Sequence, residues 1–439
     1  MNKSFFFLLS LLLLLCATSS CGTCRSKQTQ TQKEVVSKVQ SPSQYLQGKI
    51  ENNKLTISQD IDLNGKQYAI PEGIELVFKG GIIKNGTLIG NKTRIDCITA
   101  AFDRVNIKGN WIVPYITTRL FADLGYTNSL CDVLALANPE IKNTIEIEDG
   151  DYTVQAEREK GVCLMLFDNT NIIINGTIHL APNDYEGYDI IKVSGSNVYI
   201  SGHGAIIGDR NQHTGSKGEF GMGIDVKGAK NISICGLSIK DCWGDCIYVG
   251  NNSKNVKVEG CNLDNARRNG ISVTDADGVE IRKCRISNVR GTNPQDAIDI
   301  EPNKNCKVDH VLIDSVEVMN CVGGVIVSKG SKNISNKKIG VVKIINSKVS
   351  TTAKYPIRVK FCESAIIENN VLSGNDVNSV ICVNDTPDVI IRNNHIRNRD
   401  KTKLDRSNNI NNAANIKGKA PIVVIRAKKQ SVSGNSIIQ

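Results

Sequence analysis

The sequence predicts an all-β solenoid in which short parallel strands wind into stacked coils, a parallel β-helix. Short strands that begin with a turn residue recur along the chain, as at 171–174, 197–200, 231–234 and 255–258. Aromatic residues make up only 5% of the chain, which holds 37 glycines, and this suits stacked short strands with many turns. No helical pattern separates the strands, whereas parallel βαβ units need one and propeller blades need a longer period.

Each repeat contains three strands, which we call the first, second and third strand. The third strands align one beneath another and start 23, 24, 27, 27 and 32 residues apart, at Gly223, Cys246, Gly270, Ala297, Gly324 and Pro356. Most strands alternate apolar and polar residues, which indicates one buried face. Cysteine or asparagine precedes several second strands, which predicts an internal side-chain ladder at Cys261, Cys284, Asn370 and Asn394.

The N-terminal segment has the pattern of an export signal. A short positive start is followed by an apolar run, Phe5 to Leu15, interrupted only by Ser10 and too short to span a bilayer stably. Small residues then precede Cys21, which is similar to the lipobox of bacterial lipoproteins. The resemblance implies a signal peptide at 1–20 and a lipid on Cys21. A polar tether at 21–44 would follow and would anchor an exported protein to the bacterial outer membrane. The pattern does not indicate whether the protein faces the periplasm or the cell surface.

The remaining chain, 45–439, is predicted to be one β-helix domain. Apolar residues at i, i+3, i+4 and i+7 predict a helix at about 127–137. A strand and a Gly-Asp-Tyr sequence at 150–152 come next, and a polar, asparagine-rich insertion is expected at about 398–419. With the repeats, this order resembles the pectate-lyase-like right-handed β-helix superfamily, which implies a right-handed coil whose open end the helix covers.

Charge and cysteine content narrow the classes of partner. The net charge is +10, but much of the excess lies in the tether and in the stretch 392–429, so it says little about the central coils. Basic residues are spread without stacked aromatics, which argues against a nucleic-acid partner.

Twelve of the 15 cysteines lie beyond the anchor region, and their repeat positions indicate core packing rather than disulfides.

The third strands predict a strip of functional groups on one face, because alternate side chains of a coil point outward. The strip combines acids and bases over about five coils, or roughly 20 Å. The predicted catalytic residues are Asp245, Arg268, Asp296, Asp299 and Glu301. The predicted substrate-binding residues are Trp243, Tyr248, Arg267, Lys329, Arg358 and Lys360. A strip of mixed charge with an aromatic residue suits a polysaccharide, and the superfamily resemblance implies one.

Two chemistries fit this strip. A lyase acting on a uronate chain needs a base, for which Arg268, Lys329 or Arg358 are candidates, and it would use the acids to hold Ca²⁺. A hydrolase needs two carboxylates, and Asp245 and Asp296 stand two coils apart, about 9.6 Å between backbones. The alternative is a non-catalytic glycan-binding or structural envelope protein. The sequence Gly202-His-Gly204 is interpreted as a turn, because the partner motifs of polygalacturonase-type hydrolases are missing.

Overall fold

The computed structural model describes residues 50–158, 161–330, 336–374, 379–397 and 421–438. The predicted signal peptide, Cys21, the tether and the insertion at 398–419 lie outside the described residues. The chain divides into two compact units, one containing 50–113 with Leu120–Ala122, the other Pro114–Arg119 with Asp123 onward. No helix in the described ranges is long and apolar enough to cross a membrane. The grouping of 45–439 into one domain stays a prediction.

The first unit is a small sheet whose described strands pair in parallel except for the hairpin of β1 and β2. Its strands are β1 (Ile50–Glu51), β2 (Lys54–Ile57), β3 (Ile61–Asp62), β4 (Gln67–Ala69), β5 (Glu75–Phe78), β6 (Ile83–Asp96) and β7 (Phe102–Ile112). Phe102 is fully buried and makes edge contacts with Phe78 and Trp111, with ring centroids 5.8 Å and 6.4 Å apart. This aromatic cluster forms the centre of the unit's core.

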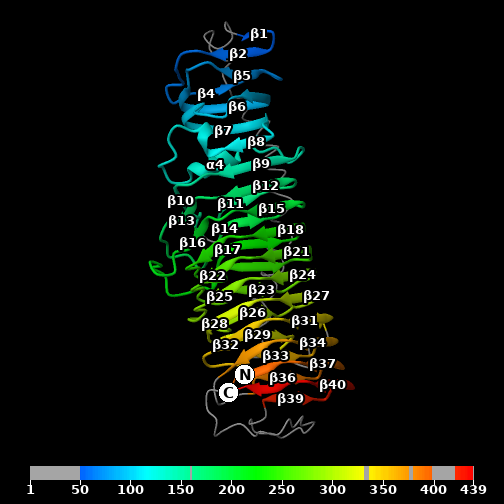
Figure 1. Ribbon diagram of the computed structural model, residues 1–439. Coiled ribbons are helices and arrows are strands. Elements are labelled where there is room, and N and C mark those ends of the chain that lie inside the picture. The colour runs from blue at the N-terminus through cyan, green and yellow to red at the C-terminus, as the bar shows by residue number, and fades with distance from the viewer. Residues whose placement is uncertain (1–49, 159–160, 331–335, 375–378, 398–420, 439) are drawn as a thin grey trace, which may run out of the picture. The chain divides into compact units, whose positions relative to one another are not determined.

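The second unit is a parallel β-helix built from three sheets, each made of one strand per coil (Figure 1). The first-strand sheet contains β8 (Tyr115–Thr117), β9 (Asn143–Ile147), β12 (Thr170–Ile174), β15 (Val198–Ser201), β18 (Lys230–Cys235), β21 (Ser253–Glu259), β24 (Ala276–Arg282), β27 (Lys307–Asp314), β30 (Lys338–Ile339), β31 (Val341–Ile345), β34 (Ser364–Glu368), β37 (Asp388–Arg392) and β40 (Lys429–Ser433). The second-strand sheet contains β10 (Asp151–Val154), β13 (Thr177–Leu180), β16 (Ala205–Ile207), β19 (Ser238–Lys240), β22 (Asn262–Asp264), β25 (Arg285–Ser287), β28 (Glu317–Cys321), β32 (Lys348–Thr351), β35 (Val371–Ser373), β38 (His395–Arg397) and β41 (Ser436–Ile438). The third-strand sheet contains β11 (Val162–Leu166), β14 (Gly187–Val193), β17 (Phe220–Lys227), β20 (Ile247–Gly250), β23 (Ile271–Val273), β26 (Asp296–Ile300), β29 (Gly323–Ser328), β33 (Ile357–Lys360), β36 (Ile381–Asn384) and β39 (Ile422–Ile425).

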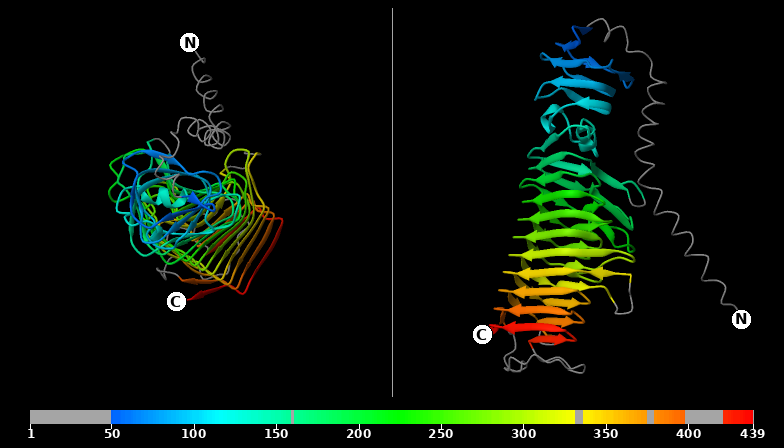
Figure 2. Two further views of the ribbon diagram at one scale, coloured as in Figure 1. Left: turned by 90° about the horizontal axis from the view of Figure 1, so that it is seen from above. Right: turned by 90° about the vertical axis from the view of Figure 1, so that its right-hand side faces the viewer.

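Stacked aliphatic side chains form the core of the second unit. In the third-strand sheet, Ile224, Ile247, Ile271 and Ile298 are register partners in consecutive coils, and each is fully buried. Burying one such side chain contributes roughly 1.5–3 kcal/mol, so the repeat supplies the stability of the coil. The left view of Figure 2 shows successive coils of this unit lying over one another. The predicted repeat and fold class are confirmed.

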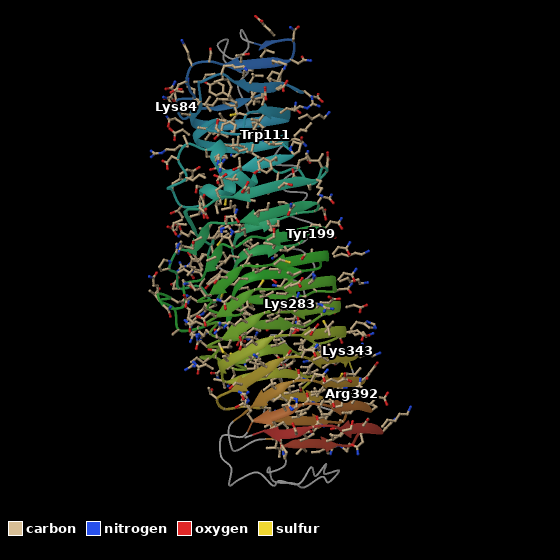
Figure 3. All side chains as sticks on the ribbon, viewed as in Figure 1. Lys84, Trp111, Tyr199, Lys283, Lys343 and Arg392 are labelled. Atoms are coloured by element: carbon tan, nitrogen blue, oxygen red, sulfur yellow. The ribbon has the colours of Figure 1, made fainter. Side chains whose placement is uncertain are left out.

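The turn residues that precede the first strands have a clear structural purpose. Asn169, Asn197, Asn231 and Asn255 all adopt left-handed backbone conformations, with φ between 53° and 60°, which asparagine tolerates better than most residues. The side-chain amides of Asn197, Asn231 and Asn255 each donate to the amide oxygen of the asparagine one coil earlier, at 3.0–3.2 Å. On the same sheet, Lys343 and Arg392 project away from the coil (Figure 3).

The predicted internal ladder is also confirmed. Cys261 and Cys284 are buried just before β22 and β25, and the cysteines among the described residues are free thiols. Farther along, the buried amide of Asn394 accepts from the backbone N–H of Asn370 at 3.0 Å and donates to the carbonyl of Ile367 at 2.9 Å. The ladder therefore satisfies main-chain groups that the coil buries.

Replacing Asn394 by leucine is expected to lower the free energy of unfolding by about 2 kcal/mol, because the Asn370 N–H and the Ile367 carbonyl would lose their partners inside the protein. Chemical denaturation measures the change. Asn262→Leu is a matched control at an exposed position of β22 and should change stability by less than about 0.5 kcal/mol. Equal effects of the two substitutions would contradict a structural ladder.

The helix predicted at about 127–137 is shorter than expected. The structure forms α4 over Ser129–Leu134, beside β10 and β11, the first strands of their sheets. The side chain of Asn128 accepts from the backbone N–H of Gln155 and does not cap the helix. At the other end, Pro139 disfavours helical backbone at the residue before it. The predicted bounds were therefore too wide at both ends.

Candidate functional site

The predicted strip lies on the outer face of the third-strand sheet. The registers align Asp225, Tyr248, Ser272, Asp299, Ile326 and Arg358 in consecutive coils. Asp245, Asn269 and Asp296 form a second row at the corner before these strands. Within this row, Asp245 accepts from the backbone N–H of Asn269, and Asn269 accepts from that of Asp296, each at 3.0 Å. These carboxyl and amide groups hold successive coils together, with Asn269 between the two acids.

Asp245 and Arg268 form a buried ion pair. The Asp245 side chain has no exposed surface, and its Oδ2 lies 2.9 Å from Arg268 Nη1 and 2.7 Å from Ser272 Oγ. Burial raises the pKa of Asp245 to about 6, although Arg268 and the hydrogen bonds oppose the rise. Arg268 also lies 3.5 Å from Glu219 Oε2, so it joins two carboxylates.

Asp296 and Asp299 have fewer hydrogen bonds than Asp245. Both lie on β26, with 2% and 5% of the residue surface exposed. Lys354 Nζ stands 3.7 Å from Asp296 Oδ1, and Asn269 Nδ2 stands 3.5 Å from Asp299 Oδ2. Burial raises the pKa of Asp296 to about 7. Burial, then the neighbouring Asp296, raises the pKa of Asp299 well above its ordinary value.

Gly323 makes room for the Asp296 carboxyl group. It is the register partner of Asp296 in the next coil, and a Cβ atom there would lie 1.8 Å from Asp296 Oδ1. A larger residue would displace this carboxyl group. Glycine suits position 323 because the Asp296 carboxyl group of the preceding coil occupies the space that a side chain would need.

The C-terminal side of the strip carries cations. The Arg358 guanidinium lies over the Tyr355 ring at 5.0 Å, and its buried Nε has no hydrogen-bond partner among the described residues. Lys329 Nζ lies 5.8 Å from the centre of the Phe361 ring. Burial and then Arg358 lower the pKa of Lys360. Glu301, 45% exposed, pairs with Lys337 at 3.9 Å. The strip is therefore acidic around β20 to β26 and basic around β29 to β33.

Two of the predicted substrate-binding residues are engaged within the protein. The Trp243 ring stacks on His213 with centroids 3.8 Å apart, and the Arg267 guanidinium lies 3.7 Å from the same ring. Groups this close must occupy opposite faces, so neither face is open to a sugar. Substrate binding by Trp243 stays a prediction, but stacking of a sugar on its ring would require His213 or Arg267 to move. Tyr248 is also engaged, since its hydroxyl bonds Thr274 Oγ1 at 2.7 Å and its ring lies beside Lys227.

Several groups near the strip were missed by sequence reasoning. Asp209 and His213 bond at 2.8 Å with both side chains fully buried, and Tyr188 donates to the same carboxylate. An Asp and a His four residues apart in a glycine-containing loop offered the signal for this pair. Lys354 had no comparable signal, since its partner Asp296 is far away in sequence.

The carboxylates do not offer a Ca²⁺ ligand set. Asp245 is bonded to Arg268, Ser272 and Asn269, and Asp296 faces Lys354. Over the described ranges, no three His, Cys, Asp or Glu side chains are grouped to hold a metal ion. Ca²⁺ prefers several free oxygen ligands, so these residues do not fit the ion.

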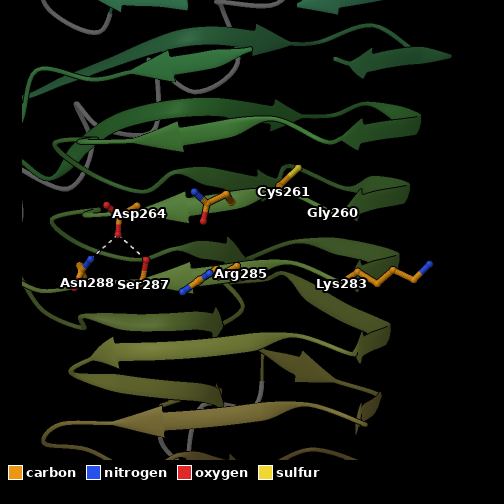
Figure 4. Close-up of a pocket in the computed structure, with 8 residues that line it drawn as sticks. Gly260, Cys261, Asp264, Lys283, Arg285, Ser287 and Asn288 are labelled. Atoms are coloured by element: carbon orange, nitrogen blue, oxygen red, sulfur yellow. Dashed lines mark hydrogen bonds between the residues drawn. The ribbon is translucent and has the colours of Figure 1, made fainter. Parts of the chain in front are cut away.

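Two other features lie away from the strip. His203, in the Gly-His-Gly sequence, occupies the turn between β15 and β16, with its side chain 75% exposed. A hollow lies on the second-strand sheet, where Asp264 accepts from Ser287 and Asn288, and Lys283 and Arg285 also line it (Figure 4). The Asp264 carboxylate is already paired in this way, so we place the candidate site on the third-strand sheet.

Comparisons with known proteins agree with this fold. Residues 170–339 match the family model described as a right handed beta helix region. Two uncharacterized Bacillus subtilis (strain 168) proteins are similar: the SPbeta prophage-derived YorA, 29% identical over 206 residues, and YclG, 30% identical over 224. The matches cover 40% and 44% of this chain, but only 35% and 38% of those relatives.

The A-module of the mannuronan C-5 epimerase AlgE6 from Azotobacter vinelandii has a similar structure. Its TM-score is 0.50 at 13% sequence identity, and the match covers 71% of this chain and 95% of that module. At this identity the likeness shows the fold alone. The matched region and the stacked parallel coils show that the second unit has a right-handed parallel β-helix fold.

Proposed function

We propose that this protein hydrolyses an acidic polysaccharide at the strip, with Asp299 as the proton donor and Asp296 as the base. The observation that carries the proposal is the pair of buried carboxyl groups on β26, both with raised pKa values. Two carboxyl groups in unequal environments are the arrangement that glycoside hydrolysis requires. Neither is held by a strong hydrogen bond, so both remain available for proton transfer.

The proposed reaction follows from these raised pKa values. In it, Asp299 donates a proton to the glycosidic oxygen as the bond to the anomeric carbon breaks, because burial and the neighbouring Asp296 raise its pKa and favour the protonated form. Asp296, with a pKa of about 7, accepts a proton from the water that attacks that carbon. Arg268 lies near Asp299 and would favour the carboxylate that forms once the proton has left. Asp245 holds Arg268 in place.

The surroundings of Arg268 make it a poor base for a lyase reaction, and this favours hydrolysis. A lyase must remove a carbon-bound proton with an unprotonated base. Although burial opposes it, pairing with Asp245 and Glu219 raises the pKa of Arg268 above its ordinary value. Lys360 is different, because its pKa is lowered by burial and by Arg358. A lyase using Lys360 is therefore the second candidate.

An acidic substrate is supported by the basic part of the strip. The three cations come from adjacent coils: Lys329 directly follows β29, and Arg358 and Lys360 lie on β33. In the part of the chain that the structure describes, Arg358 and Lys329 lie against aromatic rings and form no ion pair with a carboxylate, and glycan carboxylates or sulfates would complement them. We further propose that the protein is exported and lipid-anchored through Cys21, which would present the strip to polysaccharide in the cell envelope.

Incubating the purified protein with a panel of uronate-containing and neutral polysaccharides tests the proposal. We expect new reducing ends without absorbance from an unsaturated sugar, and faster release from acidic glycans. Unsaturated products would mean elimination and would contradict hydrolysis. Binding of a glycan, measured by calorimetry, without any product would favour the non-catalytic role.

A further inference from the structure

We infer that His213 is a positioning residue, which fixes the segment 208–219 so that Glu219 restrains Arg268 beside the carboxyl pair on β26. The inference rests on the proposed function and extends it to a residue outside the strip. His213 would not touch the substrate. It would act through three successive contacts, which begin at Asp209 and end at Arg268.

The first contact fixes His213 itself. Asp209 and His213 lie in the segment between β16 and β17, and both side chains are fully buried. His213 Nδ1 lies 2.8 Å from Asp209 Oδ2, and the carboxylate also accepts from the Tyr188 hydroxyl and, at 3.1 Å, from the backbone N–H of Asn183. Because the carboxylate is an acceptor, Nδ1 carries the proton. Asp209 therefore holds the imidazole ring through Nδ1, and Tyr188 and Asn183 in turn hold the Asp209 carboxylate.

The second contact joins the segment to the coil that carries Trp243. His213 covers one face of the Trp243 ring at an interplanar angle of 20°, and Arg267 covers the other. Arg267 Nη1 then donates back to the carbonyl of Gly218 at 2.9 Å. The segment is thus attached near its middle by His213 and near its end by Gly218, with one aromatic ring between the two attachments.

The third contact reaches the strip. Glu219 directly follows Gly218 and precedes β17, and its Oε2 lies 3.5 Å from Arg268 Nε. The charged groups that face Arg268 are Asp245, Glu219 and Asp299. Glu219 is the one of these three that the segment carries. Its position therefore sets how fully the Arg268 charge acts on Asp299, the proposed proton donor.

His213→Phe and Glu219→Gln test the inference in the full-length protein with an acidic polysaccharide. Phenylalanine keeps a ring against Trp243 but loses the Nδ1 donor. We expect each variant to lower kcat by roughly tenfold, as small misplacements do. We also expect the basic limb of the pH profile to move to lower pH. With less negative charge beside it, Arg268 would act more fully on Asp299, which would then lose its proton at lower pH.

Coupling between the two positions separates positioning from mere packing. If His213 acts through Glu219, the double variant should match the more impaired single variant rather than multiply the two losses. His213→Asn, which keeps a donor near the Nδ1 position, should restore part of the pH profile. His203→Phe, at an exposed turn, should leave both kcat and the profile unchanged. Multiplying losses, or a basic limb that Glu219→Gln does not move, would overturn the inference.

The test also distinguishes this inference from the proposed function. If the wild-type protein turns over no polysaccharide, the proposed function fails. The wild type, His213→Phe, Glu219→Gln and the double variant are then compared by thermal unfolding. Positioning still predicts that the double variant loses less Tm than the two single variants summed. Additive losses of Tm would show that His213 and Glu219 are independent, and the inference would fail on its own.

Discussion

Asp299→Asn is expected to lower kcat by about 10²–10⁴-fold, which is the contribution of general acid catalysis in proteins. Asparagine has nearly the same shape as the protonated carboxyl group but cannot give up a proton to the glycosidic oxygen. Because 5% of Asp299 is exposed and its one hydrogen bond, to Asn269, is long, the substitution should leave the coil intact. Initial rates of reducing-end release measure the loss.

The pH profile gives this prediction a second readout. In the wild-type protein, activity should rise as Asp296 loses its proton near pH 7 and fall at higher pH, where Asp299 loses its own. The falling limb should disappear from the residual activity of Asp299→Asn. Asp264→Asn makes the same change on the second-strand sheet and should have full activity. A wild-type rate in Asp299→Asn would remove Asp299 from the mechanism.

Arg268→Met is expected to destabilise the protein by about 3–5 kcal/mol at pH 8, because it leaves the Asp245 carboxylate buried without its cation. Arg268 is the main group that opposes the raised pKa of Asp245, so this pKa should rise further in the variant. A raised pKa stabilises the folded state at low pH, and that contribution is lost as the pH rises through the folded-state pKa. The destabilisation should therefore be small near pH 5 and grow toward pH 8.

Chemical denaturation at the two pH values measures this difference. Arg392→Met is the matched control, since Arg392 is 53% exposed and pairs with Glu368 on the surface at 2.7 Å. It should cost no more than about 1 kcal/mol and show little dependence on pH. Equal losses for the two arginines, or a loss at Arg268 that does not depend on pH, would contradict the buried pair.

The fold could be predicted from the sequence because its determinants are local and repeated. Strand alternation, the turn asparagines and the ladder at Cys261 and Asn394 recur at similar spacings, so each coil reports the same structure. The rows of outward-facing residues follow from these registers, and Asp245, Asp296 and Asp299 could be placed on one face in advance. The helix ends were less certain, because the Asn128 side chain bonds a distant N–H instead of capping α4.

The sequence by itself determined the coil, its registers and the face that bears the acids, since alternation and stacking depend on neighbours along the chain and one repeat away. Only the tertiary structure decided how each side chain on that face is used. It placed His213 and Arg267 on the two faces of Trp243, Arg268 between Asp245 and Glu219, and Lys354 beside Asp296. These partners come from turns of variable length between the strands. Burial and charge at each acid depend on where those turns lie in space, which the repeat pattern does not specify.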